Sequence, residues 1–238
     1  MSNMKFFILD VFGEARYSGN QLAVVLAPPG LTGLEMQDIA REINFSETTF
    51  ILSDAPCDGG CDVRIFTPAA EVDFAGHPTL GTASVIRSLG AGRPVDEVRL
   101  NLKVGRIPVR FETDAGEGGL AWMRQADPTF GRSLDPAAAA AVLGLKAADL
   151  DDRWPVEQVS TGLPHVIIPL RSFEALGRIA LDRPAYESFV SGAWAKVVLA
   201  FASGGYREGQ SLGARVFPVA FGIPEDPATG SGIGCLGA

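Results

Sequence analysis

Apolar residues recur in short segments along the first half of the chain, and their spacing predicts more strands than helices. Strands are predicted for these segments: residues 5–11, 20–26, 48–53, 61–66, 98–104, 107–113 and 120–124. Residues 33–43 instead carry Leu34, Ile39 and Ile43 along one face, which predicts a helix. A second helix is predicted over residues 78–89, an apolar run that Gly90 ends.

Strand patterning stops near residues 126–128, which predicts two lobes, residues 1–126 and residues 127–238. Helices are predicted in the second lobe over residues 135–143, with Asp135 as the cap, and over residues 184–193. Its predicted strands are residues 155–161, 165–170, 195–202 and 214–219. Each lobe gathers several strands around one late helix. This order predicts an α+β fold and not the regular βαβ alternation of a Rossmann sheet.

One motif occurs twice, once in each lobe. Its two copies are His77-Pro78-Thr79-Leu80-Gly81-Thr82-Ala83 and Asp226-Pro227-Ala228-Thr229-Gly230-Ser231-Gly232. A polar residue before a proline predicts a helix start, with His77 or Asp226 as the cap and the proline in the first turn. Helix starts present N–H groups and a partial positive charge, so two of them brought together could hold a small carboxylate. The different residues at like positions predict different roles around one ligand.

Composition narrows the class of protein. The chain has 238 residues and a formal net charge of -8, without a run of Lys or Arg, so nucleic acid and anionic membranes are poor partners. No apolar stretch reaches the ~20 residues that span a bilayer, and the apolar segment near the N-terminus is too short for an export signal. We therefore expect a cytoplasmic protein.

The cysteines and histidines do not predict a metal site. There are 3 cysteines and 2 histidines, and no second cysteine pair follows Cys57 and Cys61. Those two thiols are expected to be exposed in a turn. Cys235 is expected to be a small core residue, and His165, within a strand-like run, a core or edge residue.

Glu47 is the strongest candidate for proton transfer. An isolated glutamate at a helix-to-strand junction is usually a solvated loop residue. Here Ser46 and Thr48 supply hydroxyl groups beside it, and Phe45 and Phe50 lie on either side in the sequence. Partial burial among these residues would raise the pKa of the carboxyl towards values useful in acid/base catalysis.

Several ordered motifs together resemble the PhzF phenazine-biosynthesis isomerase family, over nearly the whole chain. They are Asp10-Val11-Phe12 with Gly19-Asn20, Asn44 to Phe50, Phe66-Thr67-Pro68, Glu71 to Gly81, Thr161 to Pro164, and Glu225 to Ser231. The resemblance implies a diaminopimelate-epimerase-like fold: two similar lobes, each a barrel-like, mostly antiparallel sheet around a central helix, with the active site in the cleft between them. It also implies a homodimer without cofactors.

The resemblance places the general acid/base at Glu47 and other active-site positions at His77, Asp226 and Ser231. Related epimerases have cysteines at the two helix starts, so His77 and Asp226 argue against a two-thiol racemase. We expect substrate contacts from these residues: Asn20, Ser46, Gly76, Thr229, Gly230 and Ser231.

The leading hypothesis is an isomerase that moves a proton within a small unsaturated or cyclic carboxylate, without a cofactor or a metal. The alternatives are a catalytically weak binding or interaction protein that keeps the fold, and an amino-acid epimerase. The binding hypothesis is motivated by the expectation of a truncated second lobe, because only eleven residues follow Pro227. An epimerase would need acid/base groups on both faces of one carbon.

Overall fold

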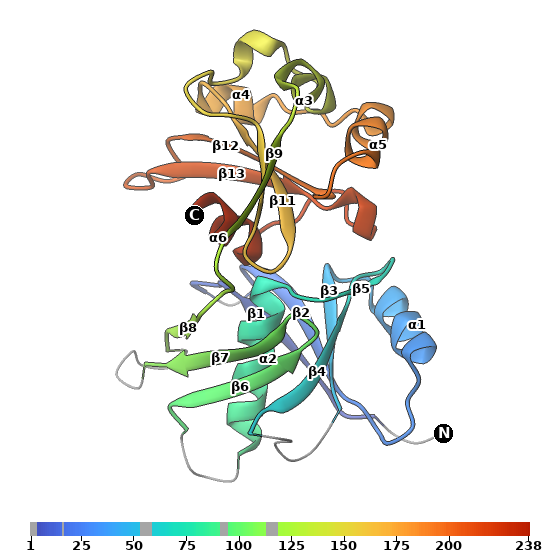
Figure 1. Cartoon of the computed structure of the whole chain (residues 1–238). Helices are drawn as coiled ribbons and strands as arrows, with labels where there is room; N and C mark the ends of the chain where they lie inside the picture. The colour runs from blue at the N-terminus through green and yellow to red at the C-terminus, as the bar shows by residue number, and fades with distance from the viewer. Residues whose placement is uncertain (1–3, 16, 53–58, 91–94, 113–118) are drawn as a thin grey trace. The chain divides into compact units, whose positions relative to one another are not determined.

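The chain forms two compact units (Figure 1). The computed structural model describes residues 4–15, 17–52, 59–90, 95–112 and 119–238. The first unit comprises Met1–Ala126 with Phe221–Ile223 and Ala228–Ser231, and the second comprises Asp127–Ala220 with Pro224–Pro227 and Gly232–Ala238. The segment Ala228–Ser231, which the sequence places in the C-terminal lobe, thus clusters with the first unit.

The first unit is a curled sheet around one helix. Its helices are α1 (Gly33–Ile43) and α2 (Gly76–Leu89), and its strands are β1 (Phe6–Val11), β2 (Asn20–Leu26), β3 (Glu47–Ile51), β4 (Cys61–Phe66), β5 (Glu71–Val72), β6 (Glu97–Leu102), β7 (Gly105–Phe111) and β8 (Ala121–Met123). The strand order is β1-β2-β3-β4-β6-β7-β8, with β5 paired to β4. The described pairs are antiparallel except β2 with β3 and β4 with β6. Figure 1 shows these strands curling around α2.

Small residues allow α2 to lie inside the sheet. Gly81, Thr82 and Ala83 are buried, and a Cβ atom at position 81 would lie 2.5 Å from the Leu22 Cδ2 atom and 2.9 Å from the Val11 Cγ2 atom. Both contacts are closer than real Cβ atoms tolerate, so the glycine permits β1 and β2 to approach the helix. A helix buried on most sides is typical of the centre of a barrel-like sheet.

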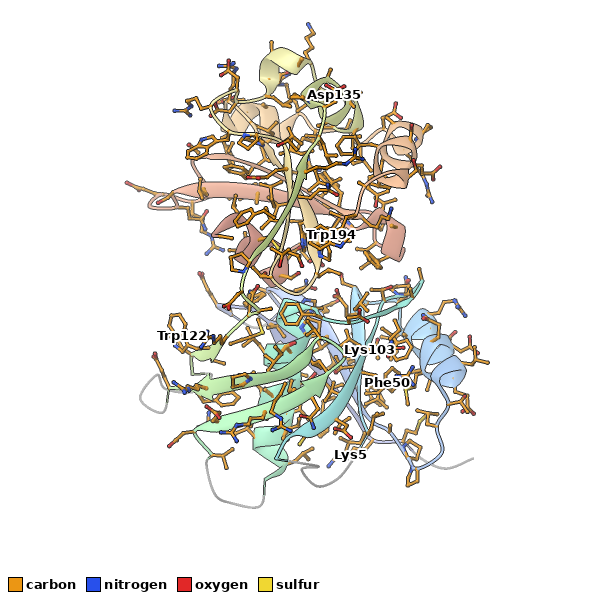
Figure 2. The ribbon with its side chains drawn as sticks, viewed as in Figure 1. Lys5, Phe50, Lys103, Trp122, Asp135 and Trp194 are labelled. Carbon is orange, nitrogen blue, oxygen red and sulfur yellow. The ribbon has the colours of Figure 1, made fainter. Side chains whose placement is uncertain are left out.

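Helix α1 covers the outer face of the same sheet. Its buried residues Met36 and Ala40 belong to one apolar cluster with Phe50 and Phe66. The two phenylalanine rings meet edge to face, with centroids 5.4 Å apart, and Figure 2 shows Phe50 on the side of the sheet nearer α1. The predicted bounds of α1, residues 33–43, are confirmed. Thr32 caps this helix by a capping box with Glu35, and Asn44 ends it in the left-handed conformation.

The predicted helix starts at His77 and Asp226 are wrong. Helix α2 begins one residue before His77, with Ala75 as the N-cap, so Pro78 is its third residue. A proline fits there because none of the first four N–H groups of a helix has an intrahelical partner. Helix α6 (Gly230–Leu236) begins four residues after Asp226. Asp226 instead forms an extended bridge in which its N–H donates to the carbonyl of Val216, at 2.9 Å, which keeps it out of the helix.

The second unit is a five-stranded sheet with helices packed on it. Its elements are β9 (Thr129–Ser133), α3 (Pro136–Val142), η1 (Ala147–Asp149), β10 (Glu157–Ser160), β11 (Pro164–Pro169), α4 (Phe173–Gly177), α5 (Arg183–Ser191), β12 (Val197–Ser203), β13 (Leu212–Phe217) and η2 (Val219–Phe221), and most of α6 also lies in this unit. The strand order is β13-β12-β11-β10-β9, with only β11 and β12 parallel among the described pairs. The α+β fold with curled, mostly antiparallel sheets is confirmed.

Local signals in the second unit correctly predicted the start of α3 but missed short elements. Asp135 caps α3 as predicted, because its carboxylate accepts from the N–H groups of Ala137 and Ala138. The sequence missed β9, whose residues show no regular alternation of buried and exposed positions, and α4, which has only 5 residues. Among the described residues, none of the helices combines the length and apolar character needed to cross a membrane.

Cys61 differs from its prediction, since it is 6% exposed at the start of β4. The expectation of an exposed thiol is wrong for Cys61, because this end of the strand faces the interior of the sheet. Cys57 lies outside the described residues. In the part of the chain that the structure describes, no group of three His, Cys, Asp or Glu side chains is arranged to hold a metal ion.

Candidate active site

Two elements of the first unit bring Glu47 and His77 together. Glu47 is the first residue of β3, and His77 is the second residue of α2. The hydroxyl groups of Thr49 and Thr82 are hydrogen-bonded at 2.7 Å, which ties the strand to the helix just beyond these two residues. Both threonines are fully buried, so this bond holds the spacing between the carboxylate and the imidazole.

The Glu47 carboxylate faces the His77 imidazole in a largely buried site. The Glu47 Oε2 atom lies 3.5 Å from the His77 Nε2 atom, and the two side chains are 13% and 3% exposed. This distance is beyond the usual 2.7–3.2 Å range of a hydrogen bond, so a short hydrogen bond to the ring does not fix the carboxylate in place. The carboxyl group and the imidazole therefore lie side by side in a region from which water is largely excluded.

Asn20 fixes the orientation of the imidazole. Its Nδ2 atom lies 3.2 Å from the His77 Nδ1 atom and donates to the carbonyl of Ala228 at 3.0 Å. An amide NH₂ group only donates, so Nδ1 accepts and the ring proton of the neutral imidazole is on Nε2. The imidazole therefore directs an N–H group, and not a lone pair, towards Glu47.

The start of α6 packs against the start of α2. A Cβ atom at position 76 would lie 2.6 Å from the Ser231 amide nitrogen and 2.8 Å from the Gly230 carbonyl carbon. A Cβ atom at position 230 would lie 2.9 Å from the Phe12 ring. Gln125 donates from Nε2 to the carbonyl of Gly230 at 3.3 Å. The backbone at the two helix starts can meet because both positions lack a side chain.

The structure brings most of the predicted site residues to one region of the first unit. Glu47, His77, Asn20, Gly76 and Gly230 are joined there by the contacts above. The remaining first-unit residues of the predicted set are Ser46, which is half-buried next to Glu47, Thr229, which precedes Gly230, and the buried Ser231.

Asp226 belongs to the second unit and is 7% exposed. Its approach to His77 stays a prediction.

Sequence reasoning missed three contributors to this arrangement. Thr82 was quoted only as part of the repeated motif, and Phe12 only as part of the family resemblance. No sequence pattern pointed to Gln125, because its side chain donates to the carbonyl of Gly230, 105 positions away. Contacts of this kind depend on the tertiary fold and leave no local pattern.

The second unit holds a buried histidine and thiol. His165 is 0% exposed, and burial lowers the pKa of its imidazole to about 4. Its Nδ1 atom donates to the carbonyl of Leu163 at 2.8 Å, because a carbonyl only accepts. Cys235 is 3% exposed, with Sγ 3.6 Å from that nitrogen, and burial raises the pKa of the thiol. This burial confirms the predictions that Cys235 is a core residue and that His165 is a core or edge residue. A protonated thiol is a poor nucleophile.

The chain combines an α+β fold of two units with a buried carboxylate beside an imidazole in the first unit. The chain matches the family described as phenazine biosynthesis-like protein, PhzC-PhzF, over residues 9–238, and it belongs to that family.

Curated relatives and solved structures agree with this family assignment. The chain is 38% identical to trans-2,3-dihydro-3-hydroxyanthranilate isomerase from Pseudomonas aeruginosa over 98% of this chain and 78% of that protein. A Bacillus anthracis phenazine biosynthesis protein of the PhzF family matches with a TM-score of 0.86 at 29% identity, covering 99% of this chain and 79% of that one. The chain is an isomerase of the PhzF type. A probable proline racemase from Agrobacterium radiobacter, at 9% identity, 90% and 72% coverage and a TM-score of 0.61, shares the fold alone.

Substituting Gly76→Ala should destabilise the protein by about 1–3 kcal/mol, because the added Cβ atom meets backbone atoms that cannot rotate away. Urea unfolding measures the change. Gly177→Ala is the matched control, because a Cβ atom at position 177 meets nothing within 4 Å. Equal stability of the two variants would contradict the close contact at position 76.

Lowering the pH should reduce the free energy of unfolding through protonation of His165. Its pKa is lowered from 6.5 to about 4 in the folded state, so the unfolded state binds more protons between these values. This stabilisation is complete above pH 6.5 and is lost as the pH falls through 4, an effect of about 3 kcal/mol. The free energy of unfolding, measured against pH, should fall more steeply in the wild type than in His165→Gln. Identical slopes would show that His165 does not titrate in this way.

Proposed function

We propose that this protein is a cofactor-independent isomerase that moves a proton within a small unsaturated or cyclic carboxylate, with Glu47 as the general acid/base. The observation that carries the proposal is the buried Glu47–His77 pair, with its 3.5 Å separation and its imidazole oriented by Asn20. The P. aeruginosa relative is named for trans-2,3-dihydro-3-hydroxyanthranilate, an unsaturated cyclic carboxylate. We propose this compound as the first substrate to assay.

In the proposed reaction, Glu47 removes a proton from one carbon of the substrate. The electron pair left behind is delocalised through the adjacent double bond, and the same carboxyl group returns the proton to a second carbon on the same face. The double bond shifts, and no atom is gained or lost. Proton transfer by a positioned side chain contributes about 10²–10⁴-fold to the rate, and orientation of the substrate supplies much of the rest.

The tautomer of His77 supports Glu47 as the base. The Nδ1 lone pair of the imidazole already accepts from Asn20, and Nε2 carries a proton. The neutral ring is therefore poorly placed to remove a proton from carbon. Its Nε2–H group instead stabilises the Glu47 carboxylate before the transfer and can polarise a polar substituent of the substrate.

The start of α2 is proposed to bind the substrate carboxylate. The N-cap residue Ala75 has no side-chain oxygen to accept from the N–H groups of the first turn, and the helix dipole adds partial positive charge there. Around this helix start we propose substrate contacts from these residues: Asn20, Ser46, Gly76, Thr229, Gly230 and Ser231. Asp226 is proposed as a catalytic side chain together with Glu47 and His77, and it lies two residues before Ala228, whose carbonyl accepts from Asn20. From the family resemblance, we further propose a cytoplasmic homodimer.

Glu47→Gln should lower turnover by about 10²–10⁴-fold while the protein stays folded, because the substitution keeps the shape and removes the basic oxygen. The assay follows conversion of trans-2,3-dihydro-3-hydroxyanthranilate. Glu42→Gln, on the exposed surface of α1, is the control and should keep the wild-type rate. Retention of more than about a tenth of the rate by Glu47→Gln would remove Glu47 from the mechanism.

The same assay in deuterated water separates the candidate functions. The proposed isomerase should convert the substrate to its double-bond isomer, with deuterium on the new carbon in those turnovers in which the Glu47 carboxyl proton exchanges with solvent before its return. Deuterium on the original carbon would indicate an epimerase, and unlabelled, unchanged substrate that still binds would indicate a binding protein.

A further inference from the structure

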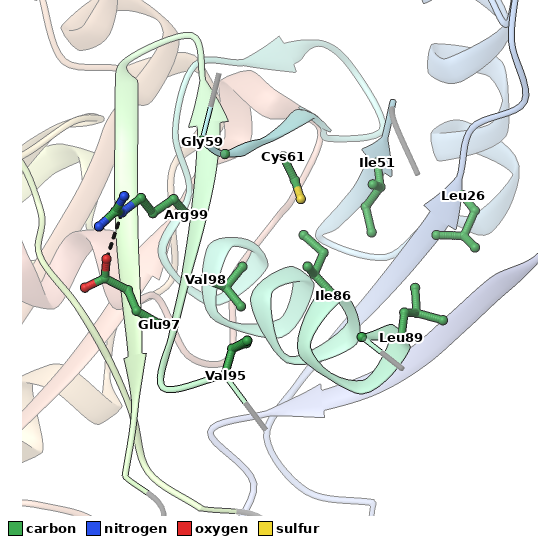
Figure 3. A pocket seen from close by; sticks show the side chains of 12 residues that line it. Leu26, Ile51, Gly59, Cys61, Ile86, Leu89, Val95, Glu97, Val98 and Arg99 are labelled. Atoms are coloured by element: carbon green, nitrogen blue, oxygen red, sulfur yellow. Dashed lines mark hydrogen bonds and ion pairs between the residues drawn. The ribbon is translucent and has the colours of Figure 1, made fainter. Parts of the chain in front are cut away.

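A cavity of about 630 Å³ lies in the first unit at the C-terminal end of α2 (Figure 3). The side chains that matter for its chemistry come from α2 and four surrounding strands or strand ends: Leu26, Ile51, Cys61, Ile86, Leu89 and Val98. Leu89 is the last residue of α2, and His77 is near its first, so at 1.5 Å per residue about 18 Å of helix separates the cavity from the candidate active site. The cavity is therefore a different site.

The walls of this cavity are apolar. Glu97 and Arg99 border it on β6, but they are paired with each other at 2.8 Å, and Figure 3 shows both side chains directed away from Ile86. Val98, between them in the sequence, is 5% exposed and faces the helix. Because successive residues of a strand point to opposite faces, the charged groups lie outside the sheet and the apolar one lies inside. Among the described lining residues, none directs a charged group to these inner walls.

Cys61 gives the cavity one soft, polarisable group. Its sulfur is directed towards Ile86 in Figure 3, and burial, with a smaller contribution from Asp62, raises the pKa of the thiol. The group is thus a neutral thiol at pH 7 and not a nucleophile. Because sulfur makes favourable contacts with aromatic rings, Cys61 favours an aromatic occupant over an aliphatic one of similar size.

We propose that this cavity is a second binding site, for a small, uncharged aromatic molecule of one or two rings. Its volume lies within the range of about 300–1,000 Å³ that is usual for small-molecule sites, and apolar cavities of this kind bind apolar molecules in preference to water. The site takes no part in the proton transfer proposed for Glu47. It gives the first unit a ligand at each end of α2.

Toluene and methylcyclohexane, which share one carbon skeleton and differ in aromaticity, test the proposal by NMR titration of the folded protein. Toluene should bind saturably, with a dissociation constant below about 1 mM, and more tightly than methylcyclohexane by about 2- to 10-fold. Cys61→Val should remove that preference. No binding of toluene, or equal binding of the two compounds to the wild type, would overturn the proposal.

Two tryptophan substitutions locate the binding. Leu89→Trp places a larger side chain at the cavity and should weaken toluene binding by at least about tenfold; position 89 is 40% exposed, which leaves room for the chain to fold. Leu34→Trp, on the exposed face of α1 at 81% exposure, is the matched control and should bind as the wild type does. Ile86→Phe is a second cavity variant, to be used if circular dichroism shows that Leu89→Trp does not fold. Equal binding by a folded cavity variant and the control would place toluene elsewhere and refute the site.

Discussion

The backbone of Gly76 lies directly against the backbone of Gly230 and Ser231, and a side chain at position 76 would leave no room for that contact. A Cβ atom there would come within 2.6 Å of the Ser231 nitrogen. Because a buried backbone group is held by its neighbours on both sides, such a contact cannot relax as a flexible side chain would. The beginnings of α2 and α6 are therefore fixed relative to each other, although more than 150 residues separate them in the sequence.

The polar contacts around Glu47 depend on this packing. Asn20 can donate both to His77 and to the carbonyl of Ala228 only while residues 228–231 lie against α2. Through Asn20, the position of that segment sets the tautomer of His77 and the N–H group that faces Glu47. The Thr49–Thr82 hydrogen bond then holds the strand of Glu47 against the helix of His77. The tautomer of His77 and the position of the Glu47 carboxylate thus depend on the backbone packing at Gly76.

Local signals predicted much of this arrangement, and tertiary contacts account for the rest. Periodicity located α1, β2 and β4 and placed Glu47 at a helix-to-strand junction, and the capping residue Asp135 located α3. The repeated proline motif marked both helix starts but misplaced them, because a proline is tolerated at several positions of a first turn and Asp226 is held in an extended bridge. The roles of Gln125 and of Asn20 towards Ala228 involve residues more than 100 positions apart, for which a single sequence has no pattern.

The nuclear Overhauser effect between the α-protons of Gly76 and the amide proton of Ser231 tests the central contact most directly, in solution and without a substrate. The account predicts a strong cross-peak, comparable with those between adjacent strands of the first unit. A spectrum with the interstrand cross-peaks of β1 and β2 present and the Gly76–Ser231 cross-peak absent would contradict it.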